Sequence, residues 1–204
     1  MITNHERPRW SFYATWILLT SLSIPIAFFL TLIVLRIITR VVGDVIYVDG
    51  VRHITEDYLW IYPFIPIVGL LTGGLQYGLL RRYLPRMGGW VLATAGGWLL
   101  GVLLIALPGR ENLINEFLGM SLVFLLMGLS IGVGQWLILR QRLAHAGWWI
   151  AANLLGWGLL GLIRADSTLD QFSLFVIGLL PACVTALVLA LLMKGDPTAQ
   201  PQTV

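Results

Sequence analysis

Six long apolar runs, separated by short charged segments, constrain this chain more than any other feature. They cover about residues 12–35, 59–80, 89–107, 117–139, 148–163 and 171–193. A helix needs roughly 20 apolar residues to cross a hydrocarbon layer about 30 Å thick. The runs therefore predict an all-α polytopic membrane protein with six transmembrane helices, of which the fifth is the shortest.

The composition excludes most other classes of protein. Only 11% of the 204 residues are charged and 58% are hydrophobic, whereas a soluble domain carries about a quarter charged residues. So few charged residues could not give a globular protein a polar surface. The composition therefore excludes a soluble enzyme, a nucleic-acid-binding module and a disordered chain. The first run is too long for a signal-peptide core and has no convincing small-residue cleavage site, so we expect it to be retained.

The basic residues predict the orientation of the spans. Six spans place both termini, and the loops after the second and fourth spans, on one side, which holds eight of the 13 Lys and Arg residues. Short loops rich in Lys and Arg stay in the cytoplasm. We therefore expect cytoplasmic termini, with the basic loops meeting anionic headgroups. The predicted cytoplasmic anchor consists of Arg81, Arg82, Arg86, Arg140 and Arg142.

Most of the tryptophans stand near predicted span ends, where an amphipathic ring lies at headgroup level. These are Trp10, Trp60, Trp90, Trp136, Trp148 and Trp149. The remaining three, Trp16, Trp98 and Trp157, lie deeper. We expect those three to pack between helices rather than to stack on a ligand.

The chain contains an internal repeat. Residues 69–100 align without a gap with residues 128–159, and 13 of the aligned pairs are identical. The shared pattern is G-x3-G-x2-Q-[YW]-x2-L-R, a short loop, and G-x-W-x2-A-x3-G-W. We interpret it as a duplicated helical hairpin whose two copies have the same orientation, unlike the inverted repeats of many alternating-access transporters.

Each copy carries a seam of small residues with one glutamine. Small residues four apart let two helices approach closely. In lipid the hydrophobic effect does not drive helices together, so this close van der Waals packing drives their association instead. Such a seam serves either the bundle interior or a partner subunit. For Gln76 and Gln135 we expect hydrogen bonds to backbone or to each other across a pseudo-twofold axis, with a ligand or pigment contact as the alternative. The small residues are Gly69, Gly73, Ala93 and Gly97, then Gly128, Gly132, Ala152 and Gly156.

Chemically active groups are missing from the spans. No Asp, Glu, Lys or His lies in the middle of a run, although such residues mark proton relays and ion pathways. Cys183 is the single cysteine, so neither a disulfide nor a cysteine metal cluster is expected. We find no catalytic fingerprint, and we predict neither enzymatic activity nor a metal site. No cofactor is predicted, although a pigment or lipid held by amides or backbone stays open.

Two segments outside the spans have their own patterns. In the outer loop, residues 36–58, apolar alternation around Asp49-Gly50 predicts a β-hairpin. Its acids and His53 suggest a cation site, but without EF-hand or zinc spacing we favour a solvated loop. Residues 1–194 are expected to form one transmembrane domain, and the polar tail 195–204 is expected to be disordered.

At the two Q-[YW]-x2-L-R and G-x-W-x2-A-x3-G-W motifs, the chain resembles small multi-pass bacterial membrane proteins to which no activity is assigned. The resemblance covers the second to fifth spans and implies a bacterial inner membrane, but no site residues. We predict a non-enzymatic accessory subunit or scaffold that contacts the bilayer and a membrane protein partner or a second copy, with no nucleic acid. The alternative is a small-molecule or lipid transport component.

Overall fold

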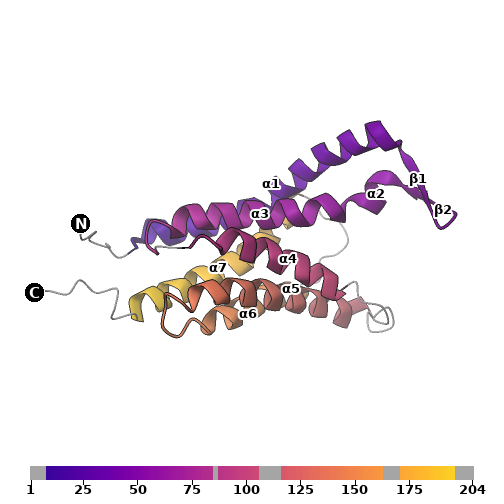
Figure 1. The fold of residues 1–204 in the computed structure, drawn as a ribbon. Helices are drawn as coiled ribbons and strands as arrows, with labels where there is room; N and C mark the ends of the chain where they lie inside the picture. The colour runs from indigo at the N-terminus through magenta and orange to yellow at the C-terminus, as the bar shows by residue number, and fades with distance from the viewer. Residues whose placement is uncertain (1–7, 85–86, 106–115, 163–170, 196–204) are drawn as a thin grey trace, which may run out of the picture.

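The computed structural model describes residues 8–84, 87–105, 116–162 and 171–195 (Figure 1). Apart from one β-hairpin, the regular structure of these residues is helical. In chain order the elements are α1 (Trp10–Val42), β1 (Val45–Val48), β2 (Val51–Ile54), α2 (Thr55–Leu59), α3 (Ile61–Leu80), α4 (Trp90–Ile105), α5 (Glu116–Leu139), α6 (Trp148–Leu162) and α7 (Gln171–Gly195).

Four of the helices are long and apolar enough to cross a membrane, as expected of a multi-pass membrane protein. They are α1, α3, α5 over Leu122–Leu139 and α7 over Phe175–Lys194. The helices α4 and α6 are also apolar but have only 16 and 15 residues, or about 24 and 22 Å at 1.5 Å per residue. The six predicted spans correspond to α1 and α3–α7, but the crossing by α4 and α6 stays a prediction.

The six longer helices form a closed ring. Each helix from α3 to α6 packs against the helix that follows it, and α1 packs against both α3 and α7. The beginning of α1 and the end of α7 lie at the same end of the bundle, which we call the terminal end (Figure 1). The ring closes through α1 and α7, two helices at opposite ends of the chain.

Glycines of the predicted seam lie where neighbouring helices of the ring approach most closely. A Cβ atom on Gly69 would lie 2.7 Å from the Cα of Ala95, and one on Gly128 would lie 2.7 Å from a backbone oxygen of α6. A Cβ on Gly97 would lie 2.6 Å from the Cα of Ile131 on α5. These positions therefore serve the bundle interior, one of the two uses that the sequence left open.

The helix α1 continues past the predicted end of the first span at Leu35 to Val42. A charged side chain such as Arg36 ends an apolar run but does not end a helix. Backbone hydrogen bonds hold a helix together whether its side chains are apolar or charged. α1 ends at Gly43, which has a φ of 99° and donates its N–H to the carbonyl of Thr39 at 2.8 Å. The φ values of 51° at Asp49 and 78° at Gly50 then fit the tight turn of a hairpin.

The end of α1, the hairpin and α2 together form an outer arm, residues 36–58. Two contacts show how α1 runs alongside α3 and the segment after it: Phe12 packs against Tyr83, and Ser23 bonds to Thr72. Eleven residues along α1 therefore correspond to eleven residues back along the other segment. By the same spacing, Leu35 lies level with the start of α3. The arm therefore projects beyond the bundle at the end opposite the terminal end (Figure 1).

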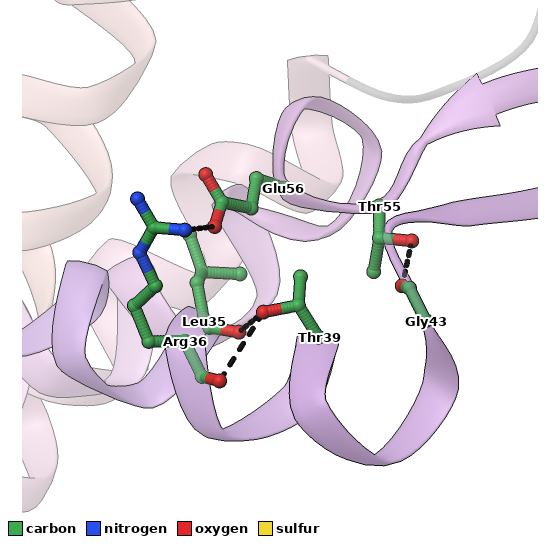
Figure 2. Close-up of polar contacts among 6 residues, drawn as sticks. All are labelled: Leu35, Arg36, Thr39, Gly43, Thr55 and Glu56. Carbon is green, nitrogen blue, oxygen red and sulfur yellow. Dashed lines mark hydrogen bonds and ion pairs between the residues drawn. The ribbon is translucent and has the colours of Figure 1, made fainter.

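Side-chain contacts hold the parts of the outer arm together (Figure 2). The guanidinium of Arg36 lies 3.3 Å from the carboxylate of Glu56, and the hydroxyl of Thr55 donates to the carbonyl of Gly43 at 2.7 Å. The first contact joins α1 to α2, and the second joins the C-cap of α1 to the first residue of α2. The arm is thus a folded unit that carries many exposed side chains.

Candidate functional site

A buried polar network lies at the centre of the ring, around the two repeat-related glutamines. Gln76 on α3 and Gln135 on α5 are 5% and 2% exposed. The Nε2 of Gln135 donates to the Oε1 of Gln76 at 3.1 Å. Each Oε1 also accepts an indole N–H, from Trp90 at 3.2 Å and from Trp149 at 2.8 Å, respectively. The glutamines thus bond to each other, one of the arrangements expected from the sequence.

Two threonines extend the network, and one of them adds α1 to it. The Nε2 of Gln76 donates to the hydroxyl of Thr20 on α1 at 3.2 Å, and the Nε2 of Gln135 donates to the hydroxyl of Thr94 on α4 at 3.0 Å. The Thr94 hydroxyl in turn donates to the carbonyl of Trp90 at 2.9 Å. Both ends of each amide therefore have partners, as buried polar groups require.

Three tryptophans form a layer on the terminal side of these amides. Trp16, Trp90 and Trp149 are all fully buried, and their rings meet edge to face with centroids 6.0–6.4 Å apart. Trp90 and Trp149 stand at the first and second positions of α4 and α6, but their rings are buried inside the bundle, where a glutamine accepts each N–H. Trp10 and Trp148, in contrast, are 78% and 67% exposed.

The contacts of the two hairpins recur a third time between α7 and α1. The indole N–H of Trp16 donates to the hydroxyl of Thr185 at 3.2 Å, as the N–H groups of Trp90 and Trp149 donate to glutamines. Gly178 stands seven residues before Thr185, and its added Cβ would lie 2.8 Å from the Cα of Ser21. Three helix pairs, α3–α4, α5–α6 and α7–α1, thus each contain a tryptophan N–H that is bonded to a polar side chain of the paired helix.

The contacts at the junctions between the helix pairs involve corresponding positions. Gly97 meets Ile131 of the next pair, and Gly156 meets Pro181, whose Cα would lie 2.7 Å from an added Cβ. At the third junction the hydroxyls of Ser23 and Thr72 are hydrogen-bonded at 2.7 Å. Ile131, Pro181 and Thr72 each stand four residues before a side chain that accepts an indole N–H. These acceptors are Gln135, Thr185 and Gln76, respectively. The ring is therefore closed by three similar seams.

A cavity of about 30 Å³ lies within the network. It has room for one or two water molecules, each of which needs about 10–15 Å³. The edge-to-face pair of Trp98 and Trp157, with centroids 5.1 Å apart, packs between helices as expected and borders the cavity. The other lining residues are Thr20, Thr72, Gln76, Thr94, Ile131, Gln135, Asn153, Pro181 and Thr185.

The predicted arginine anchor lies at the terminal end of the bundle. Arg81 and Arg140 directly follow α3 and α5 and are exposed, as is Arg82. The guanidinium of Arg140 lies over the ring of Trp136, 5.0 Å from its centroid, a favourable cation–π contact. The Nε of Arg142 is buried without a hydrogen-bond partner. Arg86, like the tail beyond Gly195, lies outside the described residues.

Other predicted features have simple surroundings. Among the residues that the structure describes, no three His, Cys, Asp or Glu side chains lie together in a way that could hold a metal ion. His53 of the outer arm packs against Tyr58 with ring centroids 4.7 Å apart. Cys183 is exposed on α7.

Sequence reasoning missed the two threonine partners of the glutamines, and it missed Asn153, whose Nδ2 donates to the carbonyl of Trp149 at 3.0 Å. Thr20, Thr94 and Asn153 each stand four residues after a tryptophan of the layer, so a W-x3-[TN] pattern on three helices would have indicated them. No protein-family model, curated protein or solved structure matches the chain.

Proposed function

We propose that the protein is a non-enzymatic, six-span subunit or scaffold of a complex in the bacterial inner membrane, with both termini in the cytoplasm. The observation that carries this proposal is the contrast between a closed core and an exposed arm. The polar groups of the core bond to one another, while the outer arm carries exposed apolar side chains.

The ring supports the crossing of α4 and α6. Both helices are packed on two sides by longer apolar helices, and both carry a tryptophan of the terminal-end layer and another deeper tryptophan, Trp98 or Trp157. A bilayer can thin locally around a short hydrophobic segment at modest cost. The cytoplasmic orientation of the termini rests on the excess of Lys and Arg at that end.

The core supports a scaffold better than a carrier. Pockets for small-molecule ligands have volumes of about 300–1,000 Å³, whereas the cavity in the ring measures about 30 Å³. The buried polar side chains among the described residues belong to Ser, Thr, Gln and Asn. A carrier would have to separate the three seams and break the glutamine network to admit a metabolite.

The outer arm is the proposed docking element. Val41, Tyr47, Val51 and Ile54 are between 57% and 82% exposed, and they belong to a part of the chain that projects past the bundle. In the hairpin register Tyr47 and Ile54 share one face and Val51 lies on the other, so the arm carries exposed apolar side chains on both faces, and such groups outside the hydrocarbon layer mark interaction surfaces. Because internal contacts hold the arm in shape, a partner could bind it with little ordering cost.

Affinity purification from membranes in mild detergent, followed by mass spectrometry, tests the proposal. We expect the wild-type chain to co-purify with a stoichiometric membrane complex, and the arm variant Tyr47→Ala/Val51→Ala to lose that complex. Leu92→Ala is the matched control, because Leu92 is 72% exposed on the side of the bundle, and it should retain the complex. Recovery of an ATPase pair or a bound metabolite would instead favour the transport component.

A further inference from the structure

A groove opens on the outside of the bundle at the terminal end, where the segment between α5 and α6 meets α7. Its volume is about 370 Å³, within the range of ligand pockets. Ala144, His145 and Trp148 form one side, and Val188, Leu191 and Leu192 of α7 form the other. The α7 side is entirely aliphatic, so this part of the groove suits a hydrocarbon chain.

A second hollow of about 310 Å³ adjoins the first and shares His145 and Trp148 with it. His145 has a φ of 58°, a left-handed backbone conformation that few non-glycine residues adopt. Both shared side chains are exposed. The pair therefore joins an aliphatic groove to a hollow lined by imidazole, indole and the backbone of Gly147.

Cationic groups lie at the same end as these hollows. Leu187, Leu191 and Lys194 follow one face of α7 at helical spacing. The two leucines are 63% and 60% exposed, and the exposed Lys194 stands one turn closer to the end of the helix. Arg140, also exposed, directly precedes the segment that forms the other side. Aliphatic groups towards the middle of the bundle and cations towards its end match the order of acyl chain and headgroup in one leaflet.

We propose that this groove binds one anionic glycerophospholipid from the leaflet at the terminal end. An acyl chain lies against Val188 and Leu191, and the phosphate lies near His145 and Lys194. Charge complementarity selects the anionic headgroup, because Lys194 and Arg140 attract it more than a zwitterionic one. The site is separate from the outer arm, which lies at the opposite end, so it does not depend on the proposed docking function.

Native mass spectrometry of the purified full chain, with added dioleoylphosphatidylglycerol or dioleoylphosphatidylcholine, tests the proposal. We expect one retained phosphatidylglycerol and weaker retention of phosphatidylcholine. Leu191→Trp should fill the groove and abolish retention of both lipids. Lys194→Gln should weaken phosphatidylglycerol binding about fivefold and leave phosphatidylcholine unchanged.

Two control variants separate this site from general lipid contact. Leu92→Trp adds the same ring at an exposed leucine of α4, and Arg82→Gln removes one charge from the segment between α3 and α4. Both should retain the lipid as the wild type does. If Leu191→Trp retained phosphatidylglycerol as the wild type does, the groove would not be the binding site. If Arg82→Gln and Lys194→Gln weakened phosphatidylglycerol binding equally, the proposed contact of Lys194 with the headgroup would be overturned. Lys194 is exposed on the last turn of α7, so its replacement tests the site without disturbing the fold.

Discussion

Replacement of Gln135 by leucine is the sharpest test of the polar core. The substitution conserves approximate volume but removes the amide that donates to Gln76 and Thr94 and accepts from Trp149. Two interhelical hydrogen bonds are lost at about 0.6 kcal/mol each. In addition, the fully buried indole N–H of Trp149 loses its acceptor, at a cost of about 1–3 kcal/mol.

We therefore expect Gln135→Leu to lower the free energy of unfolding by about 2–4 kcal/mol. The assay is reversible unfolding in mixed detergent micelles, followed by tryptophan fluorescence. Gln141→Leu is the matched control, because Gln141 is exposed and its amide donates only to a backbone carbonyl, that of Leu137. The control should change the stability by less than about 0.5 kcal/mol.

Combination with Gln76→Leu measures the coupling of the two amides. Because the glutamines share one hydrogen bond, the double variant should be less destabilised than the two single variants predict, by about 0.5–3 kcal/mol. Two single variants with wild-type unfolding curves and an unchanged oligomer profile would refute the structural role of the network.

Three further changes test the seams, the third helix pair and the arm. Gly97→Ala should destabilise the bundle by about 1–3 kcal/mol, because its Cβ would lie 2.6 Å from a backbone atom of α5. Its control is Gly96→Ala, where the added Cβ meets open space. The control should be neutral or stabilising in the same unfolding assay. Thr185→Val should cost about 1 kcal/mol by removing the acceptor of the Trp16 N–H, also measured by unfolding in detergent. Gly50→Ala should weaken the hairpin by about 1 kcal/mol, seen as faster amide hydrogen exchange in β1 and β2 with no change in α3.

The helices and the central glutamines could be predicted because both depend on local features of the sequence. Apolar runs indicate helices in lipid, and an amide within such a run must find a partner. The shift of 59 residues also places Gln76 and Gln135 at equivalent positions, although the duplication itself stays an interpretation of the sequence and of the recurring contacts.

The third helix pair could not be predicted in the same way. It joins α7 to α1, so its halves are in reversed chain order, and a threonine, Thr185, replaces the glutamine. A comparison of the sequence with itself detects neither the reversed order nor the replacement, because α7 and α1 become neighbours only when the ring closes. The inward turn of Trp90 and Trp149 was missed for a related reason: residues at helix ends are assigned to the interface unless a buried acceptor is known.

Hydrogen exchange at the indole nitrogens tests the central claim, a closed core held by three buried tryptophan N–H groups, most directly. The protein would be labelled with ¹⁵N-tryptophan, assigned by single Trp→Phe variants and transferred into D₂O in detergent micelles. We predict that the signals of Trp16, Trp90 and Trp149 persist while those of Trp10 and Trp148 vanish first, and that Gln135→Leu selectively accelerates Trp149. Exchange of the three buried indoles as fast as the exposed ones would contradict the account.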